Sequence, residues 1–128
     1  MLEECSFSYA LIRLVPRVER EEFINVGAIL FCPARSFLQA DMDIDCARVS
    51  ALAPEVKIEE ITPHLQSIKT ICIGGKEAGE IGALPPSARF NWLTAPRSTI
   101  IQASTVHTGI CTDPESVLAD LMNKMVRI

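Results

Sequence analysis

The first third of the chain carries apolar patterns typical of β-strands. Residues 6–15 (SFSYALIRLV) are rich in aromatic and β-branched side chains, and Pro16 ends the run. Residues 23–32 (FINVGAILFC) are almost continuously apolar, as expected for a strand that is covered on both faces. Residues 36–44 (SFLQADMDI) alternate between apolar and polar positions. Because the connections are short, these runs predict an antiparallel meander of three strands.

The middle of the chain changes to the period of a helix. Residues 43–54 place apolar side chains on one helical stripe, and Asp45 is a suitable N-cap. Residues 57–75 repeat isoleucine and leucine at helical spacing and end at Gly74. Pro63 lies inside this second pattern, where a break in the helix is expected.

The last third returns to strands and closes with a helix. A short helix is predicted over residues 87–93, capped by Ser87, followed by strands over 98–104 and 106–111. An amphipathic stripe from Val117 to Met125 predicts the last helix. The sum is one α+β domain over residues 1–128. Its antiparallel sheet has about five strands, the N-terminal meander plus two later strands, covered on one face by about four helices.

Composition narrows the range of functions. Hydrophobic residues make up 48% of the chain, charged residues 22%, and the net charge is −4, which disfavours binding along a nucleic-acid backbone. No apolar run approaches the roughly 20 residues that span a bilayer, so no membrane partner is expected. The N-terminal MLEECSFSY is acidic, unlike a secretory leader, and the cysteine count of 5 is odd. These features predict a cytoplasmic protein; they leave its oligomeric state open.

No assembled catalytic or metal motif is visible in the sequence. Asp41, Asp43 and Asp45 lack the glycine and glutamate that a calcium loop requires. The GGKEAGEIG segment follows a helix, whereas a phosphate loop precedes one. His107 and Cys111 share the parity of one strand face, which leaves a thiol–imidazole pair as an alternative to a packed cysteine. We therefore expect no metal and no cofactor, and the sequence favours a protein that is not an enzyme.

Polar residues within apolar strands are the stronger candidates for binding. Arg13, Asn25 and Gln102 each interrupt an apolar run. A buried arginine is costly unless it is paired. Arg13 therefore pairs with Glu22 across the first hairpin, or it contacts an anion or a partner.

The segment ARFNWLTAPRSTIIQAS, residues 88–104, joins a helix to a strand. Pro96 forces the preceding residue to be extended, so the helix ends there. Trp92 is expected to pack its ring against the sheet. Arg97 stands at the start of the strand. Two roles remain open for it: a residue of a binding site, or a member of a buried ion pair. The candidate binding residues are Arg13, Asn25, Arg97, Gln102 and His107.

Five segments carry a resemblance to a bacterial family, domain of unknown function 3037. They are YALIRLVP, REEFINVGAILF, FNWLTAPRSTIIQAS, VHTGICTDPE and LADLMNKMV, in this order along nearly the whole chain. The resemblance implies no catalytic residues, because the family has no established activity. It implies a genomic setting beside a kinase of the HipA type, and therefore an accessory or regulatory subunit.

Three functions follow from these features. The leading hypothesis is a non-catalytic cytosolic binding module that acts through a protein partner, a HipA-like kinase. The alternative is a small enzyme or ligand-binding domain that holds an anionic substrate with Arg13 and Arg97. Nucleic-acid binding is the least favoured, because the chain is acidic and poor in aromatic residues.

The cysteine pattern generates a first prediction. Because the cysteines are odd in number and widely spaced, all of them should be free thiols in the native protein. Intact mass spectrometry with and without reductant checks this. A mass increase of two hydrogens per bridge on reduction would contradict it.

Overall fold

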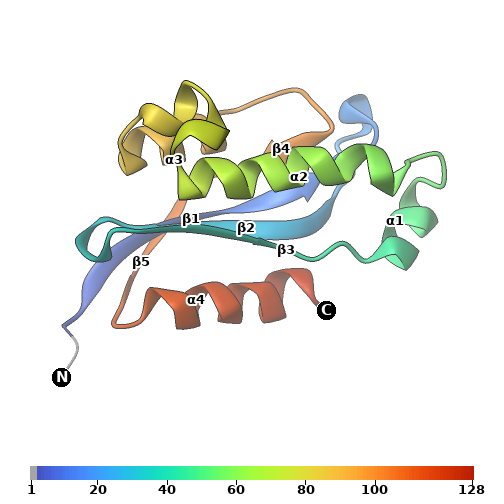
Figure 1. Ribbon diagram of the computed structural model, residues 1–128. Coiled ribbons are helices and arrows are strands. Elements are labelled where there is room, and N and C mark those ends of the chain that lie inside the picture. The colour runs from blue at the N-terminus through green and yellow to red at the C-terminus, as the bar shows by residue number, and fades with distance from the viewer. Residues whose placement is uncertain (1–2) are drawn as a thin grey trace.

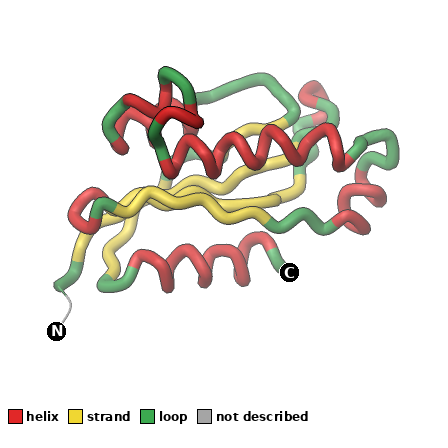
Figure 2. The backbone as a smooth tube through the Cα atoms, in the orientation of Figure 1, coloured by secondary structure: helices red, strands yellow, loops and turns green. Residues whose placement is uncertain are grey.

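A computed structural model describes residues 3–128 and confirms the predicted α+β class (Figures 1 and 2). The strands are β1 (Cys5–Leu14), β2 (Ile24–Cys32), β3 (Phe37–Met42), β4 (Ile101–Ala103) and β5 (His107–Cys111). The helices are α1 (Cys46–Leu52), α2 (Ile58–Ile73), α3 (Pro86–Thr94) and α4 (Pro114–Leu121). A π-helical turn, Met122–Val126, continues α4.

All strand pairs are antiparallel, and β1 is the strand that the others share. The order is β3-β2-β1-β4, and β5 also pairs with β1. Cys5 to Tyr9 of β1 pair with β5, whereas Ile12 to Leu14 pair with β4. Both late strands therefore lie along the same edge of β1, one after the other.

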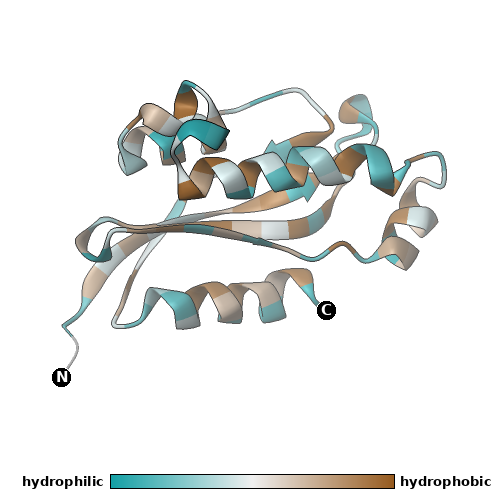
Figure 3. Ribbon diagram, in the orientation of Figure 1, coloured by the Kyte–Doolittle hydropathy of each residue, from teal (hydrophilic) through white to brown (hydrophobic). Residues whose placement is uncertain are grey.

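Helices cover both faces of the sheet, where the sequence predicted cover on one. Helices α2 and α3 lie on one face and α4 lies on the other (Figure 1). The reason is visible in β2, whose alternate residues enter two separate cores. Ile24, Val26 and Ile29 pack with α2 and α3, while Ala28, Leu30 and Cys32 pack with α4. Figure 3 shows apolar segments in the sheet and alternating apolar and polar residues along α2 and α4. The continuous apolar run of β2 thus reflects burial on both sides.

Ser104 joins the two late strands. Its backbone N–H donates to the Leu11 carbonyl at 2.8 Å, and its hydroxyl accepts from the Leu11 N–H, also at 2.8 Å. The residue is only 5% exposed. Ser104 therefore satisfies the backbone of β1 at the point where β4 has ended and β5 has not begun.

The structure confirms some of the predicted helix starts and stops and contradicts others. Asp45 caps α1 and accepts from the Ala47 and Arg48 amides, both at 3.1 Å, and Gly74 ends α2 with φ of 81°, as predicted. Ser87 is not a cap, because α3 begins one residue earlier, at Pro86. Pro63 does not break α2.

The continuity of α2 has a tertiary cause. Ile61 and Leu65, on either side of Pro63, are both buried in the core against the sheet. The packing of this apolar face offsets the hydrogen bond that proline cannot donate. No helix among residues 3–128 has the length and apolar character needed to cross a membrane.

The burial of α4 generates a second prediction. Leu121 is 8% exposed and packs in the core with Leu30 and Leu118, so Leu121→Ala should lower the free energy of unfolding by about 2 to 5 kcal/mol. Chemical denaturation measures the change. An unchanged midpoint would show that α4 does not contribute to the stability of the sheet.

Candidate functional site

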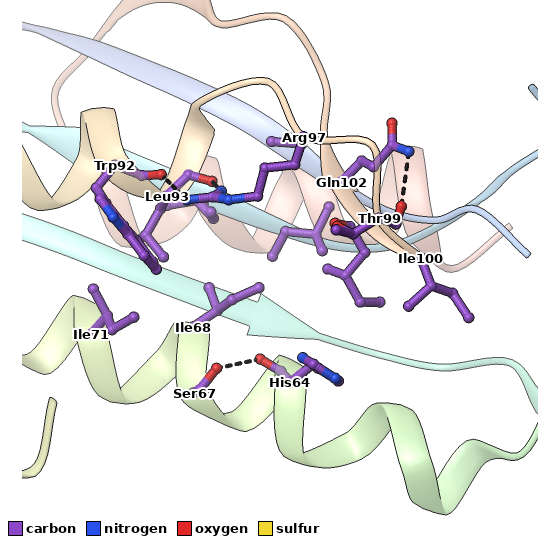
Figure 4. Close-up of a pocket in the computed structure, with 14 residues that line it drawn as sticks. His64, Ser67, Ile68, Ile71, Trp92, Leu93, Arg97, Thr99, Ile100 and Gln102 are labelled. Carbon is purple, nitrogen blue, oxygen red and sulfur yellow. Dashed lines mark hydrogen bonds between the residues drawn. The ribbon is translucent and has the colours of Figure 1, made fainter. Parts of the chain in front are cut away.

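Arg97 binds the end of the helix that precedes it. Its guanidinium donates to the Leu93 carbonyl at 3.2 Å and to the Trp92 carbonyl at 2.5 Å. Its Cζ atom also lies 4.5 Å from the centre of the Trp92 ring (Figure 4). A cation at this position satisfies the last carbonyls of α3 and complements the helix dipole. No carboxylate pairs with Arg97 among residues 3–128, so the predicted ion pair is absent there.

The sequence predicted that Trp92 packs its ring against the sheet, and this prediction is wrong. Its side chain remains 42% exposed and lies under Arg97. Arg89, Phe90 and Leu93 are the residues that α3 buries. The helix therefore turns its tryptophan toward the rim of a cavity rather than into the core.

This cavity lies between α2, α3 and β4 and has a volume of about 250 Å³. Its lining is mainly apolar and includes Ile12, Ile68, Ile71 and Ile101. Trp92 and Arg97 lie on one side of it and His64 and Ser67 of α2 on the other (Figure 4). The cavity thus combines an apolar lining with a few polar groups, as small-molecule sites do.

Three of the predicted binding residues form a row across the sheet. Arg13 of β1 is in register with Asn25 of β2 on one side and with Gln102 of β4 on the other. A register shift between Ile12 and Arg13 produces this alignment. Asn25 donates to the Met125 carbonyl at 3.2 Å, and Gln102 donates to the Thr99 carbonyl at 2.8 Å. Arg13 and Asn25 lie on the α4 side of the sheet, because Ile12 and Leu14 face the α2 side. Gln102 also lines the cavity beside Arg97, so the structure brings these two predicted residues together as well (Figure 4).

Arg13 does not pair with Glu22, so the ion pair that the sequence offered as one explanation of Arg13 is absent. Glu22 instead accepts from Arg20 at 2.5 Å, and this hydrogen bond lowers the pKa of the Glu22 carboxyl. The guanidinium of Arg13 lies over the Phe23 ring, with Cζ 4.1 Å from its centre. The buried Nε of Arg13 and the buried Oδ1 of Asn25 have no hydrogen-bond partner among residues 3–128.

Arg13 differs in this respect from the other arginines of the described chain, which all donate to a carboxylate or a backbone carbonyl. Arg89, which the sequence analysis missed, is the clearest case. It is buried and donates to the Leu84, Ile71 and Cys72 carbonyls at 3.0, 2.8 and 2.7 Å, and so caps the end of α2. The remaining cases are Arg17, Arg20, Arg35, Arg48, Arg97 and Arg127.

His107 extends the row of Arg13 along β1. It is exposed, and its ring centre lies 5.3 Å from that of Tyr9, its partner in the ladder. Phe7 follows at 6.2 Å from Tyr9. Cys111 lies four residues after His107 on β5, which is about 13 Å along the strand, and it pairs with Cys5. The thiol–imidazole pair of His107 and Cys111 therefore does not form. We call Phe7, Tyr9, Arg13, Phe23, Asn25 and His107 the Arg13 surface.

The Arg13 surface is left partly open by α4. Helix α4 and its π-turn pack beneath β2 and β3. At its margin Phe23 is 43% exposed. The surface therefore offers the exposed rings of Phe23 and His107 beside the half-buried side chains of Phe7, Tyr9 and Arg13. Arg97 lies on the opposite face, so the structure does not bring Arg13 and Arg97 together.

A cluster of three cysteines was not anticipated from the sequence. The Cys5 sulfur lies 3.1 Å from that of Cys32 and 3.9 Å from that of Cys111. All 5 cysteines are free thiols, as predicted. Burial raises the pKa of the Cys32 thiol and raises that of Cys111 to about 11. The spacings of 27 and 79 residues between these cysteines match no motif, so only the strand pairing could reveal the cluster.

Comparisons with known proteins give a family and nothing more specific. The family model described as "Protein of unknown function (DUF3037)" matches residues 9–126. No curated protein and no solved structure matches the chain significantly.

The contacts of Arg97 generate a third prediction. Arg97→Met removes the two hydrogen bonds to the end of α3 and the contact of the charge with Trp92, so it should lower the free energy of unfolding by about 1 kcal/mol. Arg97→Lys keeps the charge and should lose less. Thermal melts of both variants measure this. A loss of about 3 to 5 kcal/mol would indicate instead a stranded carboxylate partner.

Proposed function

Given that the chain belongs to the family of unknown function DUF3037, we propose a function from its surface: a non-catalytic binding module that acts through a protein partner. The partner we propose is a HipA-like kinase in a bacterial cytoplasm. The Arg13 surface is the contact site in this proposal.

The observation that carries the proposal is the pair of unsatisfied polar atoms at Arg13 and Asn25. The Arg13 Nε is a donor without an acceptor, and the Asn25 Oδ1 is an acceptor without a donor. A buried polar group without a partner costs about 1 to 3 kcal/mol. Both atoms are buried, so a bound protein segment would contact them only after the Arg13 and Asn25 side chains turn outward. A peptide group offers one carbonyl and one N–H, which would then complement these two atoms and remove a cost that the isolated chain bears.

The composition of the Arg13 surface also supports a protein partner. Tyrosine, phenylalanine and arginine are enriched at the centres of protein interfaces, where a few such residues supply most of the binding energy. Tyr9, Arg13 and Phe23 are of these types and lie on one side of the sheet. The genomic setting that the family resemblance implies is the reason for naming a HipA-like kinase.

The cavity beside Arg97 favours a second candidate function, the binding of a small ligand. The lining is mainly apolar, and two nitrogens of the Arg97 guanidinium already donate to carbonyls. A small apolar molecule suits this cavity better than the anionic substrate that the sequence suggested. Because Arg13 lies on the other face, an anion could not contact both arginines.

A matched pair of aromatic substitutions tests the proposed surface, as the fourth prediction. Phe23 and Trp92 are equally exposed, at 43% and 42%, but lie on opposite sides of the sheet. Phe23→Ser and Arg13→Met should each weaken capture of a co-expressed HipA-like kinase at least tenfold. Trp92→Ser should leave capture unchanged. Melting curves of all three variants establish that they are folded.

Two outcomes would overturn the proposal. Equal capture by every variant would remove the Arg13 surface as the contact site. Failure of the unaltered protein to capture the kinase, with the cavity binding a small apolar probe such as toluene, would favour the second candidate.

A further inference from the structure

The cluster of Cys5, Cys32 and Cys111 collects three sulfur atoms from three strands. Cys5 is the first residue of β1, Cys32 the last of β2 and Cys111 the last of β5. The three sulfurs lie within 4.8 Å of one another. Among residues 3–128 this is the one group of three or more cysteine, histidine or acidic side chains that is close enough to share an ion.

The spacing of the sulfurs is close to that around a metal with three thiolate ligands. With metal–sulfur bonds of about 2.3 Å, three sulfurs around an ion in their plane are about 4.0 Å apart. The Cys5–Cys111 distance of 3.9 Å already meets this value. The Cys5–Cys32 distance of 3.1 Å must open by about 0.9 Å, which is within reach of a change in side-chain torsion.

The surroundings of the cluster are largely apolar. Cys5 and Cys32 are buried against apolar side chains of α4, among them Leu118. Burial raises the pKa of the Cys32 and Cys111 thiols, and the positive charge of Arg35 opposes this rise. A nearby cation favours the thiolate form that binds a metal.

We propose that Cys5, Cys32 and Cys111 form a three-coordinate site for a soft monovalent cation, Cu(I). Thiolates select soft metals, and Cu(I) accepts three sulfur ligands. Zn²⁺ in a structural site takes four ligands, and the group contains no fourth side chain. On binding, the ion displaces the thiol protons to solvent. This site departs from the expectation of no metal that the sequence supported, and it is independent of the Arg13 surface.

Competition with a coloured Cu(I) chelate tests the site and is the fifth prediction. The reduced protein, kept without oxygen, should withdraw one equivalent of Cu(I) from its bicinchoninate complex, and its melting temperature should rise. Cys111→Ser should weaken the affinity for Cu(I) at least tenfold. Because Cys111 is only half-buried, this variant is expected to fold.

The two cysteines outside the cluster provide matched controls. Cys46→Ser removes an exposed thiol and Cys72→Ser a buried thiol on the other face of the sheet, and both variants should still bind one equivalent. X-ray absorption of the copper-loaded protein should count three sulfur ligands, a result independent of how the variants fold.

The proposal is overturned if Cys111→Ser binds Cu(I) as tightly as the unaltered protein. It is also overturned if Zn²⁺ binds in preference to Cu(I), or if X-ray absorption shows only two sulfur ligands. A Cys5–Cys32 disulfide that forms in air and that copper does not prevent would assign the cluster to redox chemistry instead.

Discussion

The fold depends on the pairing of β1 along both of its edges. One edge carries β2, and the other is divided between β5 and β4, with Ser104 satisfying Leu11 between them. Without this junction the backbone of β1 would be left unpaired inside the protein. The same pairing builds the Arg13 surface and the cysteine cluster from residues of adjacent strands. It places Arg13 between Asn25 and Gln102, and it brings Cys5 to Cys32 and Cys111.

Arginine has two roles in this structure. Arg89 and Arg97 bind the last carbonyls of α2 and α3, where a positive charge stabilises the helix end. Arg89 thereby joins α3 to the end of α2, and Arg97 lines the cavity. Arg13 has no such carbonyl or carboxylate partner among the described residues and rests on an aromatic ring. This contrast separates arginines that stabilise helix ends from the one for which we propose a role in binding.

The candidate site was only partly predictable. Arg13, Asn25 and Gln102 could be selected because each is a polar residue in an apolar strand, and the structure brings these three together. Arg97 was selected for its place at the start of a strand, but it belongs to the other face and caps a helix. The cysteine cluster and Arg89 gave no local signal, because the groups that they contact lie far away in the sequence or belong to the backbone.

Local periodicity by itself determined the strands, the helices, the Asp45 cap and the stop at Gly74, since each depends on residues within a few positions. The tertiary structure alone decided which face each helix covers, the continuity of α2 through Pro63 and the exposure of Trp92. It also decided the register that joins distant side chains into sites. These features depend on packing and strand pairing between segments far apart in the chain, and the free energy of such contacts outweighs local preference.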